Sequence, residues 1–258
     1  MVIYRDMYYP AANAKRRLHI YLPPNYDESD ERYPVMYLFD GHNLFFDDLA
    51  TYGKSWGLAD FLDQWEKPLI VVGMECSHEG TDRLDEYCPY PMQVVGHDVN
   101  PKGELTFRWI LHDVKPWVDG NLRTWPHREA TGIAGSSMGG IMSLYGVIAH
   151  NDVFSKAACL ATFARRCERF ILRDLRRHGI AEDTRVYLSW GEDEKGRVRR
   201  GADPATESPE AKSTSRITTA LERYGARTHT FFQEGGRHNE ASWELQNERW
   251  LRFLWLDE

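Results

Sequence analysis

The feature that most constrains this chain is the pentapeptide Gly135–Gly139, in which Ser137 stands between two glycines in the pattern G-x-S-x-G. The apolar run Ala130–Ala134 precedes it and is typical of a buried strand, and apolar residues with helical spacing follow from Ile141 to Ile148. Glycines tolerate the tight reversal that must join such a strand to such a helix. The pattern predicts strand, sharp turn and helix, with Ser137 as a candidate nucleophile. The alternative is a turn whose serines only cap the helix.

Segments with strand and helix character alternate along the rest of the chain. Two alternating segments, 2–9 and 16–22, predict an antiparallel hairpin at the N-terminus. Apolar strands are expected at 33–39, 69–74, 153–161, 184–190 and 227–233, and helices at 55–65, 104–118, 163–177, 217–224 and 241–256. This alternation predicts an α/β fold whose central sheet is mostly parallel and carries helices on both faces.

The length of 258 residues fits one domain spanning residues 1–258. Residues 195–214 are polar, with glycine, proline and mixed charges, and predict a mobile surface excursion. The segment Glu75–Gly103 predicts a long loop with many aromatic residues, and loops of that length usually have a functional role.

Composition excludes several classes of function. The formal net charge is -7, and the one basic block, 197–200, is too small for a nucleic-acid surface. The four cysteines lack C-x-x-C spacing, which argues against a disulfide framework or a metal site. No stretch approaches the roughly 18 apolar residues of a membrane span. The N-terminus has no signal-peptide pattern, so the expectation is a cytoplasmic protein without membrane partners.

A serine nucleophile needs a neighbouring base, and four histidines follow Ser137 in the chain. His150 lies on the helix after the turn, His178 ends a basic helix, and His229 lies inside a strand. His238 lies in a glycine-rich loop between the last strand and the last helix, where function often concentrates. We therefore predict His238 as the general base.

The base needs an acid that fixes its tautomer. Glu192, Asp193 and Glu194 all follow the strand that ends at Trp190. Because the chain must first turn away from the strand, Glu194 is best placed to reach back towards the base. Glu194 is the predicted acid, with Asp193 as the alternative.

Stabilising a tetrahedral intermediate requires N–H donors for its oxyanion. The backbone N–H of Met138, directly after the nucleophile, is one predicted donor. The second is expected in the loop after Phe39, at His42 or Gly41. A metal ion at His42 is not predicted, because no second ligand has a telling spacing, and no cofactor is expected.

These residues give the chain a resemblance to the Putative esterase family, the esterase D and enterochelin-esterase-like branch of the α/β-hydrolases. The resemblance implies an α/β-hydrolase fold, and it implies that Ser137 is the nucleophile, Glu194 the acid and His238 the base. The chain differs at His42, where the family usually has glutamine, and at 161–165, where relatives often have Ser-Pro-aromatic. The matching segments are 37–45, 83–90, 134–140, 186–194 and 238–243.

The resulting hypothesis is a serine hydrolase that cleaves small-molecule carboxylic esters through an acyl-enzyme. Its alternatives are an acyltransferase that uses an alcohol acceptor and a catalytically silent binding protein of the same fold. Candidate pocket walls, each of which could equally be core, are Phe163, Tyr87, Tyr90 and Trp243. The sequence leaves the acyl group, the alcohol and the oligomeric state open, a homo-oligomer included.

Overall fold

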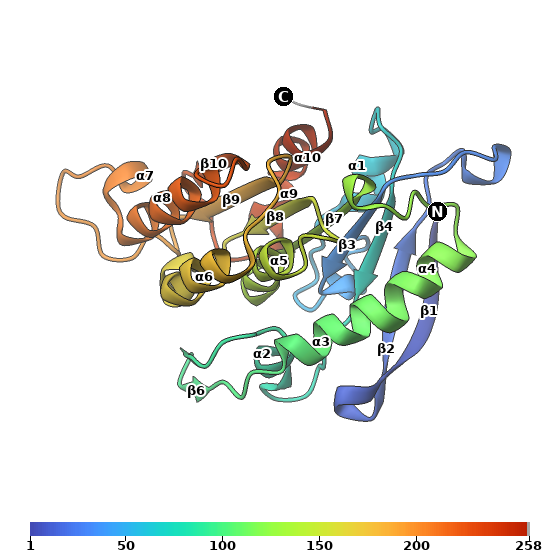
Figure 1. The fold of residues 1–258 in the computed structure, drawn as a ribbon, viewed down its shortest axis with the longest axis horizontal. Helices are drawn as coiled ribbons and strands as arrows, with labels where there is room; N and C mark the ends of the chain where they lie inside the picture. Colours follow the sequence, from blue (N-terminus) through green and yellow to red (C-terminus); the bar gives the residue numbers. More distant parts are fainter. Residues whose placement is uncertain (257–258) are drawn as a thin grey trace. The chain divides into compact units, whose positions relative to one another are not determined.

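A computed structural model of the protein describes residues 1–256 (Figure 1). Its contacts divide the chain into two compact units, Met1–Gly132 and Ile133–Glu258. That the whole chain forms one domain stays a prediction.

The first unit is built on four strands in the order β1-β2-β4-β3. β1 (Val2–Tyr9) and β2 (Ala14–Tyr21) form the predicted antiparallel hairpin, and β2 also pairs with β4 (Ile70–Met74) in antiparallel fashion. β3 (Val35–Phe39) runs parallel to β4. Every residue of β3 and β4 is buried, which explains why both strands are continuous apolar runs in the sequence.

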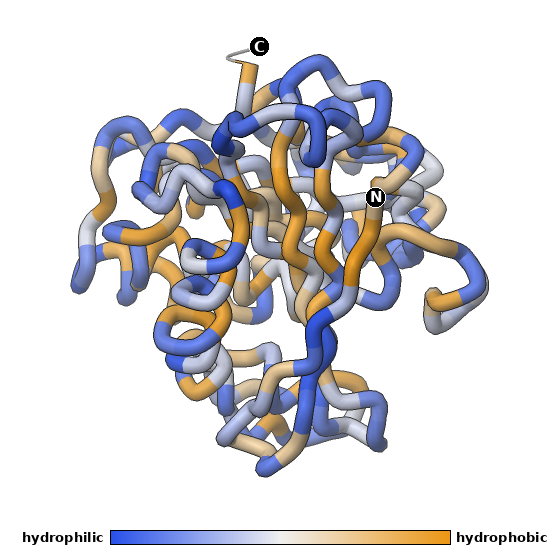
Figure 2. Tube along the Cα trace, turned by 90° about the vertical axis from the view of Figure 1, so that its right-hand side faces the viewer, coloured by the Kyte–Doolittle hydropathy of each residue, from blue (hydrophilic) through white to orange (hydrophobic). Residues whose placement is uncertain are grey.

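The strand β1 lies at the edge of this order and is only partly buried. Its hydropathy changes along its length, from apolar at Val2 and Ile3 to charged at Arg5 and Asp6. Figure 2 shows this change as orange turning to blue beyond the marked N-terminus. Charged side chains on an edge strand discourage pairing with a second chain.

A long helical segment packs against the hairpin. It comprises α3 (Gly103–Trp109), a π-helical turn (Ile110–Val114) and α4 (Lys115–Asn121), where one helix is expected from the sequence. Pro116 has no N–H for the carbonyl of the residue four positions earlier, which accounts for the change in hydrogen bonding just before it. The Trp109 indole N–H donates to the Tyr8 carbonyl at 2.9 Å and anchors the segment on β1.

The remaining elements of the first unit are short. The predicted loop Glu75–Gly103 contains one helix and a small hairpin, which give this segment its own local structure. These elements and the helix before them are α1 (Leu58–Asp63), α2 (Asp82–Glu86), β5 (Gln93–Val94) and β6 (His97–Asp98).

The second unit contains strands in the order β7-β8-β9-β10. They are β7 (Thr131–Ser136), β8 (Lys156–Leu160), β9 (Arg185–Gly191) and β10 (Arg227–Gln233). β8 and β9 are parallel, and so are β9 and β10, with Gln233 opposite Gly191. The carboxyl ends of β9 and β10 therefore lie together. With the parallel β3–β4 pair and the N-terminal hairpin, this pairing confirms the predicted α/β class.

Helices lie on both sides of β8 and β9, with α10 on one side and α5 and α6 on the other (Figure 1). The lysine ammonium of Lys156 lies 4.7 Å from the Trp255 ring centroid, a contact that joins β8 to α10. The helices of this unit are α5 (Met138–Ala149), α6 (Ala164–His178), α7 (Pro204–Glu207), α8 (Pro209–Glu222), α9 (Glu240–Glu244) and α10 (Asn247–Trp255).

Two segments of this unit differ from expectation. The predicted excursion 195–214 contains the short helix α7 and is helical again from Pro209, because the Ser208 hydroxyl accepts from the Ala211 N–H at 3.1 Å and caps α8 there. The predicted closing helix is interrupted between α9 and α10. Gln246, at the interruption, is buried and bonds to the Tyr187 hydroxyl at 2.9 Å and to Gln233 at 2.7 Å.

Candidate active site

The predicted strand, turn and helix are present around Ser137. β7 ends at Ser136 and α5 begins at Met138, so Ser137 alone forms the turn. Its backbone has φ 56° and ψ −121°, a conformation that a residue with a side chain rarely adopts. The Ser137 N–H donates to the Leu160 carbonyl at the end of β8, at 2.9 Å. Ser137 is partly exposed between buried neighbours, as an accessible nucleophile must be.

The glycines around Ser137 are needed because backbones approach one another closely here. A β-carbon on Gly135 would lie 2.7 Å from the Gly139 carbonyl carbon, too close without a backbone shift. One on Gly140 would lie 2.7 Å from the Thr162 hydroxyl and 3.0 Å from the Leu160 carbonyl oxygen. The turn can therefore be this tight only with glycine at both positions.

The N-terminus of α5 begins immediately after Ser137. The first N–H groups of a helix have no partners within the helix, and they carry the positive end of its dipole. Met138 is the first residue of α5, and its side chain is buried. Its backbone N–H thus belongs to a site that favours an anion next to the Ser137 hydroxyl.

The structure brings the predicted base and acid into direct contact. His238 Nδ1 lies 2.7 Å from Glu194 Oε1. The other carboxylate oxygen of Glu194 accepts the Gly191 N–H at 2.5 Å. The Glu194 side chain is 1% exposed, whereas that of His238 is 30% exposed. The buried carboxylate thus holds one imidazole nitrogen, and Nε2 remains for a substrate or a nucleophile.

Asp193, the alternative acid, bonds to the backbone of His238 and not to its ring. Asp193 Oδ2 accepts the His238 N–H at 2.8 Å. The end of β9 also touches the histidine loop directly, because a β-carbon on Gly191 would lie 2.7 Å from the Gly236 oxygen. The two carboxylates therefore bind different parts of His238. Asp193 accepts the backbone N–H and fixes the loop that carries His238, and Glu194 contacts the imidazole.

The predicted nucleophile, Ser137, is not hydrogen-bonded to His238 or Glu194 within residues 1–256. Such catalytic bonds are often long without a substrate and shorten when it binds. All three residues lie in the second unit, on β7–α5, after β9 and after β10.

Two of the predicted pocket aromatics flank the imidazole. The ring centroid of Phe163 lies 5.0 Å from that of His238, and Trp243 meets the imidazole edge-on at 5.3 Å. Phe163 is held at φ 48°, as the residue before α6. Trp243 lies on α9, whose first turn is capped by the Asn239 side chain. An apolar surface thus adjoins the predicted base.

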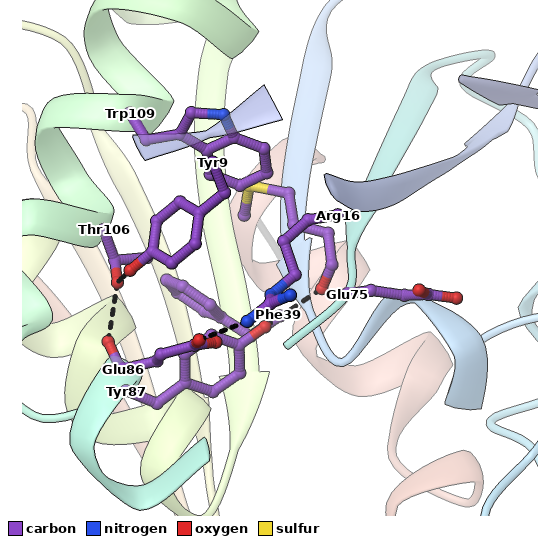
Figure 3. Close-up of a pocket in the computed structure, with 9 residues that line it drawn as sticks. Tyr9, Arg16, Phe39, Glu75, Glu86, Tyr87, Thr106 and Trp109 are labelled. Carbon is purple, nitrogen blue, oxygen red and sulfur yellow. Dashed lines mark hydrogen bonds and ion pairs between the residues drawn. The ribbon is translucent and has the colours of Figure 1, made fainter. Parts of the chain in front are cut away.

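The other two, Tyr87 and Tyr90, lie in the first unit with 2% and 1% exposure. The Tyr87 hydroxyl donates to the Met74 carbonyl at 3.0 Å, and its ring packs against Phe39 at 4.8 Å (Figure 3). These contacts are those of core residues. A role for either tyrosine in substrate binding stays a prediction.

His42 lies in the 3-10 turn Gly41–Asn43 that follows β3. Its ring is buried, which lowers its pKa to about 4, and Nε2 lies 2.9 Å from the Thr51 hydroxyl. Gly41 is in contact with the backbone of Gly73 on β4, so this turn is pressed against the sheet of the first unit. Its role as an oxyanion donor stays a prediction.

Glu210 is a residue of this region that sequence reasoning missed. It lies in the first turn of α8, is 2% exposed, and accepts the Arg165 N–H at 3.3 Å at the start of α6. It thereby holds the segment that carries Phe163. Burial raises the pKa of Glu210 to about 7. A polar stretch with Glu next to Pro gave no signal of burial.

We expect the raised pKa of Glu210 to appear in the pH dependence of stability. Between pH 4.5, the ordinary pKa of a glutamate, and about pH 7, the folded protein keeps a proton on Glu210 that the unfolded chain has released. The stability that protonated Glu210 contributes is therefore fully present below pH 4.5, and it is lost as the pH rises through about 7. Wild type should lose on the order of 1–3 kcal/mol over this interval that Glu210→Gln does not lose.

Urea unfolding at pH 4.5 and at about pH 7, followed by tryptophan fluorescence, measures this difference. The control is Glu207→Gln, which removes an exposed glutamate from the neighbouring α7 and should behave like wild type. An equal change with pH in wild type and Glu210→Gln would contradict the prediction.

Comparison with protein families gives one match that covers most of the chain. The family model described as "Putative esterase" matches residues 10–248. The uncharacterized protein YbbA of Bacillus subtilis is 25% identical over 185 residues, which cover 69% of this chain and 69% of YbbA. Esterase Rv1288 of Mycobacterium tuberculosis is 30% identical over 127 residues, covering 49% of this chain. This chain matches 25% of the length of that larger protein.

Solved structures share the fold at low sequence identity. An IroE-like serine hydrolase from Shewanella oneidensis has a TM-score of 0.75 and 19% identity, covering 100% of this chain and 81% of that one. The enterobactin esterase FES from Shigella flexneri has a TM-score of 0.71 and 15% identity, covering 99% of this chain and 59% of that one.

None of the helices within residues 1–256 combines the length and the apolar character needed to cross a bilayer.

Proposed function

Because this chain belongs to the Putative esterase family of carboxylic ester hydrolases, we propose that it cleaves esters through an acyl-enzyme formed on Ser137. The observation that carries the proposal is the 2.7 Å contact between His238 Nδ1 and the buried carboxylate of Glu194. A nucleophile elbow and an acid–base pair on the same unit are the parts that a serine hydrolase needs.

In the proposed first half-reaction, Ser137 Oγ attacks the ester carbonyl carbon while His238 Nε2 takes the hydroxyl proton. The carbonyl π electrons move to oxygen, and the resulting oxyanion accepts the Met138 N–H. The intermediate then collapses. The bond to the alkoxy oxygen breaks, the imidazolium gives that oxygen its proton, and the alcohol leaves.

In the second half-reaction, water takes the place of the alcohol. His238 removes a proton from the water as it attacks the acyl carbon, and then returns this proton to Ser137 Oγ as the acid leaves. Glu194 stabilises the imidazolium in both halves without becoming protonated.

The substrate we propose is a small-molecule ester with an apolar or aromatic group near the scissile bond. Phe163 and Trp243 support this, because their rings lie within 5.3 Å of the imidazole. Aromatic faces bind flat apolar groups well. Structural relatives include a ferulic acid esterase and a siderophore hydrolase from Aspergillus nidulans, and these activities are those proteins' own.

The test of the proposal is pre-steady-state kinetics with p-nitrophenyl esters of increasing acyl size. An acyl-enzyme predicts a burst of p-nitrophenol close to one equivalent per active chain, followed by slower turnover. A fluorophosphonate probe should label Ser137 and abolish the burst, with the site located by peptide mass spectrometry.

Each rival hypothesis gives a different result. A silent binding protein shows neither burst nor label, which would contradict the proposal. An acyltransferase would give mostly transesterified product when an acceptor alcohol is added, whereas a hydrolase gives mostly free acid. Product analysis by chromatography separates these two outcomes.

A further inference from the structure

A group of nitrogen and oxygen ligands lies in the first unit, outside the proposed triad. One ligand atom each of His42, Glu75 and His78 lies within 4.8 Å of the other two. His42 follows β3, and Glu75 and His78 follow the neighbouring parallel strand β4. The rings of His42 and His78 are 4.4 Å apart, and His78 Nε2 lies 3.9 Å from Glu75 Oε2. Adjacent strand ends thus bring together residues that are distant in sequence.

One atom of this group is left without a partner. His42 is 7% exposed, and its Nδ1 is buried without a hydrogen bond within residues 1–256. The other ring nitrogen, Nε2, lies 2.9 Å from the Thr51 hydroxyl. If Nε2–H donates to Thr51, then Nδ1 carries a free lone pair. A buried lone pair without a donor is costly, and a bound cation would remove that cost.

The carboxylate of Glu75 is oriented by a neighbouring residue. His19, which is 4% exposed, holds Glu75 Oε1 at 2.7 Å through its Nε2. Figure 3 shows the Glu75 side chain pointing away from Arg16, which instead pairs with Glu86 at 2.5 Å. Oε2 is thereby left facing His78. Ligands of metal ions are commonly fixed by such outer hydrogen bonds, here from His19 to Glu75 and between His42 and Thr51.

We propose that His42, Glu75 and His78 form a binding site for a divalent transition-metal ion of the zinc class. Two imidazole nitrogens and one carboxylate oxygen suit Zn²⁺ and Co²⁺ better than Mg²⁺ or Ca²⁺, which prefer oxygen ligands. Bonds of about 2.0–2.2 Å require the three atoms to approach one another further. The His78 side chain is 57% exposed and can make that movement.

Metal binding at this site would join the turn after β3 to the segment after β4. The expected consequence is a more stable first unit, because an ion that binds only the folded state stabilises it. A fourth position is left for water, as three protein ligands do not complete a tetrahedron. The proposal does not depend on the triad, and its test needs no ester substrate.

The experiment uses the full chain without a histidine tag, treated with chelator and then titrated with Zn²⁺ and with Co²⁺. Expected for wild type are about one Zn²⁺ per chain by elemental analysis after dialysis, a rise in Tm, and the visible absorption of four-coordinate Co²⁺. His78→Ala and Glu75→Gln should each weaken binding at least about tenfold and remove the rise in Tm.

The matched control is His112→Ala, which removes another exposed imidazole of the first unit and should bind like wild type. Equal Zn²⁺ binding by wild type and His78→Ala would overturn the proposal, and so would no binding by wild type. Thiolate charge-transfer bands with Co²⁺ would also overturn it, because they would assign the ion to cysteine. His78→Ala alters an exposed side chain, so its folding is not at risk.

Discussion

Replacing Ser137 with alanine is expected to lower kcat/KM for ester hydrolysis by about 10³- to 10⁶-fold. The proposed chemistry has no other group that could form the acyl bond. The Met138 N–H and the substrate-binding surface would remain, so a small residual rate above water is expected. Alanine keeps the β-carbon, so the strained φ of 56° is retained and stability should change little. Steady-state kinetics with a p-nitrophenyl ester and a thermal unfolding curve measure both effects.

The neighbouring serine provides the matched control. Ser136 ends β7 with 3% exposure, whereas Ser137 is partly exposed. Ser136→Ala should keep activity within a few-fold of wild type. If Ser136→Ala lost activity and Ser137→Ala kept it, the nucleophile would be assigned to the wrong serine. If both kept it, the acyl-enzyme proposal would fail.

Glu194→Gln is expected to reduce kcat by about 10²- to 10⁴-fold with little change in KM. Glu194 Oε1 holds His238 Nδ1 at 2.7 Å, and its carboxylate is buried, with 1% exposure. An amide has no negative charge to stabilise the imidazolium, and its NH₂ group favours the wrong tautomer. Glutamine can still accept the Gly191 N–H through its oxygen, so the turn after β9 should persist.

Asp193→Asn tests the alternative acid in the same assay. Asparagine can still accept the His238 backbone N–H that Asp193 accepts at 2.8 Å, so the expected loss is less than about tenfold. A larger loss in Asp193→Asn than in Glu194→Gln would transfer the role of triad acid to Asp193. Circular dichroism of both variants checks that the loop keeps its structure.

Much of the fold follows from local patterns in the sequence. The buried strands β3 and β4 are continuous apolar runs, and a β-carbon on Gly135 in the turn at Ser137 would meet the backbone of Gly139, only four residues along the chain. Such features depend on neighbouring residues, so a single sequence can reveal them. The sequence predicts a helix only from residue 217, whereas α8 begins at Pro209, because the helix begins in a polar segment where apolar periodicity gives no signal.

The interruption between α9 and α10 has a different origin. Gln246 is buried there and bonds to Tyr187 on β9 and Gln233 on β10. These partners are distant in sequence, and no pattern in the residues from 240 to 255 predicts that Gln246 bonds to them. Similarly, four aromatic residues were equally good candidates for pocket walls. Of these, Phe163 and Trp243 lie beside His238.

The sequence by itself determined the α/β class and the strand, turn and helix around Ser137. These depend on the apolar period and on where glycine is tolerated, both of which are local properties. Only the tertiary structure decided that Glu194 holds the imidazole while Asp193 holds the backbone. It alone brought His42 next to Glu75 and His78. The reason is physical: which side chains meet at a strand end depends on pairing between distant segments and on how each loop turns.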